Sequence, residues 1–264
     1  MRRILITICA LIAASVLGPA HSQELYAFLV ADTKDRAAGS AFRANVRHLK
    51  ELLGKIEKFM PVKTETVVDN QFNCRTIAAK LNKPSVKKAD AVLFYYTGNG
   101  FQTSGKFPEF DCRRSWQDRN RVGLASVAAH FTKMRERPRL VVAIADTHNK
   151  KQSRRAGPEP ERKLYFQKTY RPKLLEKLFR EGKGTYVITA AKTGEDANFV
   201  KGDGDDAGGF FTNQFLEALD QWSKKGLEES GTWELVLATA ARPIPIPEEP
   251  PMQTPYLKMQ KPRE

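Results

Sequence analysis

The chain has 264 residues and carries a formal net charge of +14 at pH 7. A chain of this length can bury one large α/β core but is hardly long enough for two. After the N-terminus it has no stretch of about 20 apolar residues, which excludes a later membrane-spanning helix. The excess of Lys and Arg favours anionic partners, although these residues are spread along the sequence, as on ordinary solvated surfaces.

The N-terminus has the pattern of a secretory signal peptide. A basic start precedes an apolar run over residues 4–17, and the small residues Gly18, Ala20 and Ser22 follow. This run is too short for a spanning helix, and small residues are typical of cleavage sites. We therefore expect residues 1–22 to be removed and the mature protein to be periplasmic or secreted.

Apolar periodicity predicts alternating strands and helices in the remaining chain. Strands are expected over residues 25–31, 63–68, 89–97, 139–145 and 185–190. Helices are expected over residues 41–60, 74–81, 124–134, 172–180, 210–224 and 232–241. Asn73 is placed to cap the second helix, and residues 253–259 form an ordered piece within a proline-rich tail. This alternation predicts a doubly wound α/β sheet in three layers.

Polar residues directly follow three of the predicted strands. Asp32 follows the first strand, Asn99 lies in a Gly-Asn-Gly turn after the third, and Asp146 and His148 follow the fourth. In an open α/β sheet, the carboxyl ends of parallel strands meet at one edge, where ligand sites lie. We therefore expect these side chains to share an edge of the sheet.

Two of these strand ends resemble known catalytic motifs. Residues 89–100 read ADAVLFYYTGNG, and residues 139–149 read RLVVAIADTHN. They resemble the motifs of the caspase-like cysteine peptidases, the group that contains caspases, metacaspases and paracaspases. That family usually reads Tyr-Tyr-Ser-Gly-His-Gly at the first position and Asp-Ser-Cys-His or Asp-Ala-Cys-Arg at the second. Here Asn99 stands at the catalytic histidine position, and His148 stands at the catalytic cysteine position.

The resemblance extends over nearly the whole mature chain. Three further segments are similar to the family's fifth strand, a following helix and the C-terminal strand: residues 185–197, 208–219 and 253–257. The resemblance implies a caspase-like domain over residues 24–259, with a mostly parallel six-stranded sheet, and a tail over residues 260–264. The basic loop over residues 149–163 falls where the family often carries a cleavable linker.

The substitutions at both catalytic positions imply a pseudo-protease. Peptide cleavage by this family needs a thiolate nucleophile and a nearby imidazole, and the carboxamide of Asn99 cannot carry a proton between groups. An inherited cleft would still bind peptides. The resemblance assigns Gly100 to the backbone oxyanion site and Asp146 to binding a basic side chain, with Asp32 as a second substrate-binding candidate. Asp146 could instead only cap its own loop.

Other sites remain open as alternatives. Cys112 could act as a displaced nucleophile with His130 or His148 as base, in an active endopeptidase specific for Arg or Lys. The favoured alternative is a structural Cys112, either free or in a disulfide with Cys74, which export would permit. Two ligands one residue apart, Asp146 and His148, are too few to bind a metal. We expect no cofactor, with weak calcium binding by the acidic loop at residues 203–206 as an outside alternative.

The expected partner is a peptide or protein ligand in the family's cleft. A second alternative is a basic binding module for anionic envelope polymers, with residues 150–163 as the contact. The sequence carries no pattern for specific nucleic-acid recognition.

Overall fold

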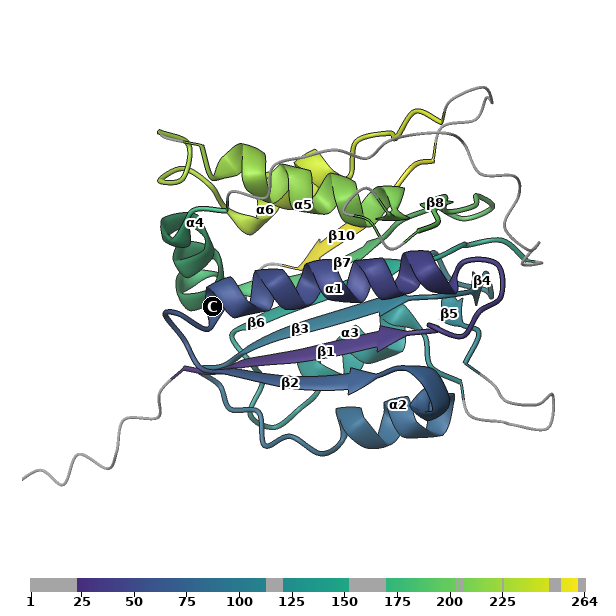
Figure 1. Cartoon of the computed structure of the whole chain (residues 1–264). Coiled ribbons are helices and arrows are strands. Elements are labelled where there is room, and N and C mark those ends of the chain that lie inside the picture. The colour runs from purple at the N-terminus through teal and green to yellow at the C-terminus, as the bar shows by residue number, and fades with distance from the viewer. Residues whose placement is uncertain are drawn as a thin grey trace, which may run out of the picture.

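The computed structural model describes residues 23–112, 121–151, 170–202, 204, 207–224, 226–246 and 253–260. Its centre is a six-stranded sheet (Figure 1). The strands lie in the order β10 (Tyr256–Gln260), β7 (Gly184–Thr189), β6 (Leu140–Asp146), β3 (Ala91–Thr97), β1 (Leu25–Ala31) and β2 (Val62–Val67). All neighbours pair in parallel except β10, which runs antiparallel to β7. The predicted fold class is therefore confirmed.

Helices cover both faces of this sheet, which gives three layers (Figure 1). One face carries α1 (Gly39–Ile56), α4 (Pro172–Glu176), α5 (Phe210–Trp222) and α6 (Trp233–Ala240). The other face carries α2 (Cys74–Leu81) and α3 (Leu124–Thr132). The remaining elements are a 3-10 turn, η1 (Asp69–Gln71), a π-helical segment, η2 (Lys177–Glu181), and two short ladders, β4 (Gly100–Phe101) with β5 (Glu109–Phe110) and β8 (Phe199–Val200) with β9 (Gly208–Gly209).

The central strands read as continuous apolar runs because both of their faces are covered. All seven residues of β1 are buried. Alternate side chains enter opposite cores: Leu25 and Leu29 pack with α1, whereas Tyr26 and Phe28 pack on the α2 and α3 side. This alternation follows from the two-residue period of a strand, and burial of both faces is typical of parallel sheets.

The predicted helix 172–180 begins at Pro172 but changes character after Glu176. An α-helical bond from the Gly182 N–H would reach the carbonyl of Leu178. That carbonyl instead accepts from the Trp233 indole N–H at 2.8 Å, and the Gly182 N–H donates to Lys177 at 3.1 Å. The wider π-helical turn therefore results from a tertiary contact, which local periodicity does not encode.

Most other predicted boundaries agree with the structure within a few residues. The first helix is displaced, since it was expected over residues 41–60 and spans Gly39–Ile56. Asn73 caps α2 as predicted, with its Oδ1 accepting from the Thr76 N–H at 2.9 Å. The expected tail begins at residue 260, but Gln260 still pairs with Thr185 in the sheet.

Some predictions concern residues outside the described ranges. These are the signal peptide at residues 1–22, most of the basic loop 149–163, and the end of the tail. Within the described residues, no helix combines the length and the apolarity needed to cross a bilayer.

Candidate functional site at the carboxyl edge of the sheet

The strand order creates a topological switch between β1 and β3. The chain passes from β1 to β2 on one side and then returns to β3 on the other. In open α/β sheets a crevice outside the carboxyl ends of the strands at such a point is the usual ligand site. Asp32 directly follows β1, Asn99 lies two residues after the end of β3, and Asp146 ends the neighbouring strand β6. The structure thus brings the predicted strand-end residues to one edge, as the sequence indicates.

Asn99 is held by contacts on both its side chain and its backbone. Its Nδ2 donates to Oδ2 of Asp35 at 2.8 Å. Its carbonyl accepts from the Tyr96 hydroxyl at 2.5 Å and from the Asp111 N–H at 2.9 Å. The carboxamide of Asn99 therefore acts as a fixed donor, with no proton to transfer.

Gly100 brings the two motif segments into direct contact. A Cβ at this position would lie 2.4 Å from Oγ1 of Thr147 and 3.0 Å from the carbonyl of His148, so only glycine fits. Gly100 also pairs with Phe110 in the β4–β5 ladder. The turn that carries Asn99 is therefore seated against the segment that carries His148. The role of Gly100 in an oxyanion site stays a prediction.

His148 is turned inward, with only 3% of its surface exposed. Its Nδ1 lies 3.1 Å from the N–H of Ala197 and 3.2 Å from Oδ1 of Asp196. These two contacts exclude each other, because Nδ1 must be unprotonated to accept from Ala197 and protonated to donate to Asp196. The ring also meets Phe199 edge to face, with the centroids 5.8 Å apart.

Asp196 stands between His148 and Lys150. Its Oδ2 pairs with Nζ of Lys150. Burial raises the pKa of Asp196, but interactions with His148 and Lys150 outweigh burial and leave this pKa below its usual value. The carboxylate is therefore ionised at neutral pH, and a protonated His148 would be paired with it. His148 is therefore buried beside a partly exposed ion pair of Asp196 and Lys150, and its Nδ1 is engaged by either Ala197 or Asp196.

Asp146 lies in the core with 0% of its surface exposed. Its Oδ2 accepts from the backbone N–H of Thr212 at 3.1 Å and from the Thr212 hydroxyl at 2.5 Å. Asn45 Nδ2 approaches the same oxygen at 3.5 Å. Thr212 lies in the first turn of α5, where free backbone N–H groups attract a negative charge. Asp146 thus holds a helix start in place, and a ligand has no access to it in this conformation.

Asp32 belongs to what we call the edge cluster, consisting of Asp32, Asp35, Asn99 and Asp111. Asp32 and Asp35 are partly exposed and Asp111 is exposed. Burial, together with the charges of Asp35 and Asp111, raises the pKa of Asp32 to about 6. Asp35 also accepts from the N–H groups of Ala37 and Ala38 at the start of α1. The cluster therefore places negative charge at the switch point of a strongly basic protein.

The structure joins Cys74 and Cys112 in a disulfide, with Cα atoms 4.9 Å apart. Both cysteines are buried. The displaced-nucleophile alternative requires a thiolate, and neither cysteine presents one while the disulfide is intact. His130 lies on α3, where its Nε2 contacts the carbonyl of Leu81 at 3.2 Å. Among the described residues, no contact connects it to the edge cluster.

No three His, Cys, Asp or Glu side chains are grouped as a metal site across the described part of the chain. Of the acidic loop at residues 203–206, only Gly204 is described. The weak calcium alternative therefore stays a prediction about residues outside the described ranges.

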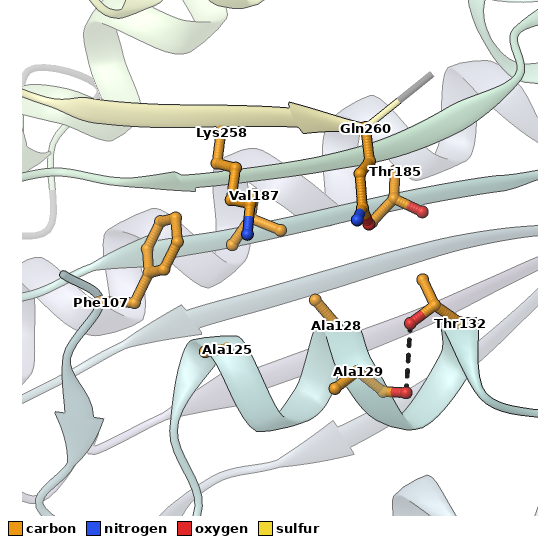
Figure 2. Close-up of a pocket in the computed structure, with 9 residues that line it drawn as sticks. All are labelled: Phe107, Ala125, Ala128, Ala129, Thr132, Thr185, Val187, Lys258 and Gln260. Carbon is orange, nitrogen blue, oxygen red and sulfur yellow. Dashed lines mark hydrogen bonds between the residues drawn. The ribbon is translucent and has the colours of Figure 1, made fainter. Parts of the chain in front are cut away.

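A separate cavity of about 240 Å³ lies between α3 and the β7–β10 edge (Figure 2). Figure 2 shows Ala125, Ala128, Ala129 and Thr132 on α3 below Val187 and Lys258 from the strands. Lys258 is the only ionisable side chain among the lining residues. The other lining residues are apolar or neutral, so this cavity lacks the grouped titratable side chains of the carboxyl edge.

Sequence reasoning did not single out Asp35, Asp111, Asp196, Asn45 or Thr212. Of these five residues, only Asn45 lies in a sequence pattern that indicates a buried polar contact. It lies on the face of α1 that also presents Phe42, Val46 and Leu49, and a polar residue within such a stripe indicates a buried hydrogen-bond partner. The other four are brought to the site by loops and by the packing of α5.

Comparisons with known proteins address only the fold. No protein-family model and no curated protein matches this chain. Among solved structures, the chain is similar to the crystal structure of protein GSU0716 from Geobacter sulfurreducens, with a TM-score of 0.57 and 16% sequence identity. The similarity covers 91% of this chain and 95% of that one. At this identity it indicates a shared architecture.

Proposed function

We propose that this protein is an exported, catalytically inactive relative of the caspase-like peptidases that binds Arg- or Lys-containing peptide segments at the edge cluster. One observation carries the proposal. The two motif segments lie against each other through Gly100, while Asn99 and His148 are both engaged in internal contacts.

The chemistry of these positions supports binding without cleavage. Peptide hydrolysis by this family needs a thiolate for attack and an imidazole for proton transfer. Asn99 supplies neither, and His148 is buried against Ala197 and Asp196. Since members of a catalytic unit act together, losing both leaves little of the acceleration.

The remaining cysteines also argue against an active cysteine peptidase. Cys74 and Cys112 are oxidised, and a disulfide sulfur does not act as the attacking thiolate. The disulfide supports export as well, since such bonds persist in oxidising compartments.

The edge cluster supports a cationic ligand. Asp32 is partly exposed, and burial, together with repulsion from Asp35 and Asp111, raises its pKa to about 6. A guanidinium or ammonium group placed among these carboxylates would relieve that repulsion and form charge-assisted hydrogen bonds. We therefore assign the recognition of a basic side chain to Asp32. Asp146, the other candidate for this role, holds the start of α5.

Calorimetric titration with a short capped peptide containing one Arg tests this proposal. We expect binding at about pH 7.5 that weakens roughly tenfold in Asp32→Asn, because one charge-assisted contact is lost. The control variant is Glu217→Gln, which removes the same charge from an exposed position on α5. A peptide with Glu in place of Arg should not bind. Equal affinity for both peptides, or no effect of Asp32→Asn, would contradict the proposal.

A further inference from the structure

A basic pocket lies at the opposite end of the sheet from the edge cluster. It has a volume of about 420 Å³, and its charged lining residues are Lys88, Arg135, Arg137, Arg139 and Lys183. We refer to it as the amino-end pocket. Its position follows from the topology, because β3, β6 and β7 are parallel neighbours and their preceding loops meet at one edge.

Hydrogen bonds between the strand starts fix the floor of this pocket. The Arg139 N–H donates to the carbonyl of Asp90 at 3.0 Å, and the Gly184 N–H donates to the carbonyl of Arg139 at 2.8 Å. The Arg139 guanidinium donates to the carbonyls of Ala89, Gly182 and Phe179. Arg139 is thus a structural cation held by backbone oxygens of η2 and of the loops before β3 and β7, and it gives the pocket a fixed positive base.

The other four cations are available to a ligand. The side chains of Lys88, Arg135, Arg137 and Lys183 form no ion pair or hydrogen bond with any residue in the described part of the chain. Buried Asp90 is the acid whose charge acts on Arg139, and its carboxylate accepts from the backbone N–H groups of Glu24 and Lys87. A bound anion would offset the mutual repulsion of these four cations around one cavity.

The size and charge of the pocket define the ligand class. Cavities of about 300–1,000 Å³ are typical of small-molecule sites. Arg presents a planar fork that matches phosphate oxygens, and Lys adds a mobile point charge. We propose that the amino-end pocket binds a compact anion with at least two closely spaced phosphate groups. This site is independent of the peptide site, because it lies at the other end of the strands.

Titration calorimetry with inorganic tripolyphosphate as the probe tests this proposal. The variant Arg135→Gln/Arg137→Gln removes two cations from the pocket. The matched control Lys50→Gln/Lys58→Gln removes two exposed cations on and just after α1. We expect the pocket variant to weaken binding by about tenfold or more and the control to change it by less than about twofold. Monophosphate should bind far more weakly than tripolyphosphate to the natural protein.

Two further measurements make the outcome decisive. Circular dichroism melting establishes that both variants are folded, and the Arg peptide should bind both with unchanged affinity. Vesicles that carry a bisphosphorylated lipid distinguish the two sources of such an anion. Retention of the protein on these vesicles would indicate a lipid headgroup, whereas tripolyphosphate binding without retention would indicate a free phosphate compound. No tripolyphosphate binding at millimolar concentration, or equal weakening in both variants, would overturn the proposal, because the attraction would then be absent or spread over the whole surface.

Discussion

The side-chain amide of Asn99 donates a 2.8 Å hydrogen bond to Oδ2 of Asp35, whose Oδ1 accepts from the N–H groups at the start of α1. The residue at the end of β3 is therefore connected through one carboxylate to the first helix. The position that resembles a catalytic histidine has become part of the framework at the carboxyl edge. The carboxamide suits this role because it donates without titrating.

Asn99→Asp should destabilise the protein at neutral pH. It replaces the donor by a second carboxylate facing Asp35, so a hydrogen bond is exchanged for like-charge repulsion. We expect a loss of about 1–3 kcal/mol in the free energy of unfolding at about pH 7.5, shrinking as the pH falls and the new carboxyl group protonates. Urea unfolding at several pH values measures this. Gln71→Glu is the control, since it introduces the same charge at an exposed position. A pH-independent loss equal to that of the control would contradict the assigned contact.

Asp146→Asn should change how stability depends on pH. Burial is the main cause that raises the pKa of Asp146 to about 6, and the Thr212 hydrogen bonds only partly offset it. The folded state therefore binds this proton more tightly than the unfolded state does. The associated stabilisation is complete below about pH 4 and is lost as the pH rises through about 6.

The asparagine variant has no such proton and still offers an oxygen to Thr212. Relative to the natural protein, its free energy of unfolding should rise by at most about 3 kcal/mol between pH 4 and pH 7, which is the equivalent of about two pKa units. Chemical unfolding across this range provides the measurement. A constant difference between the two proteins would show that Asp146 has an ordinary pKa.

Gly209→Ala should be among the most damaging small substitutions in the chain. A Cβ at Gly209 would lie 1.8 Å from Oδ2 of Asp146, the oxygen that holds the start of α5. We expect a loss of more than about 3 kcal/mol, since the backbone or the buried carboxylate must move. Gly54→Ala is the matched control. Nothing lies within 4 Å of a Cβ at this helical position, so alanine should stabilise α1 by about 0.5–1 kcal/mol. Similar melting temperatures for the two variants would contradict this packing.

The Cys74–Cys112 disulfide should stabilise the fold and should have no part in catalysis. It joins residues separated by 38 positions. Chain-entropy arguments give about 3–4 kcal/mol for a loop of this length. The variant Cys74→Ser/Cys112→Ser should lower the urea midpoint accordingly and keep its affinity for the Arg peptide. If the natural protein gained peptidase activity after reduction of this disulfide, the alternative in which Cys112 is a displaced nucleophile would be supported.

Fold class could be predicted from the sequence because the apolar runs have the lengths and periods of buried strands and amphipathic helices. The run at residues 25–31 needs no tertiary information to be read as a central strand. The sharing of an edge by Asp32, Asn99 and His148 followed from parallel topology alone. The caspase-like relationship stays a proposal, since the structural similarity concerns the architecture.

The orientations at the site could not be predicted in the same way. The strand end places Asp146 at the edge, but only the approach of α5 turns its carboxylate toward Thr212. Likewise, the inward position of His148 depends on the loop that carries Asp196 and Ala197. These contacts join segments far apart in the chain, so no local pattern contains them.

Cleavage of fluorogenic peptides with Arg or Lys before the scissile bond tests the central claim most directly. The purified natural protein should show no turnover above background, and Asn99→Ala/His148→Ala should be indistinguishable from it. Turnover by the natural protein that disappears in this double variant would contradict the account, because the carboxyl edge would then be an active site.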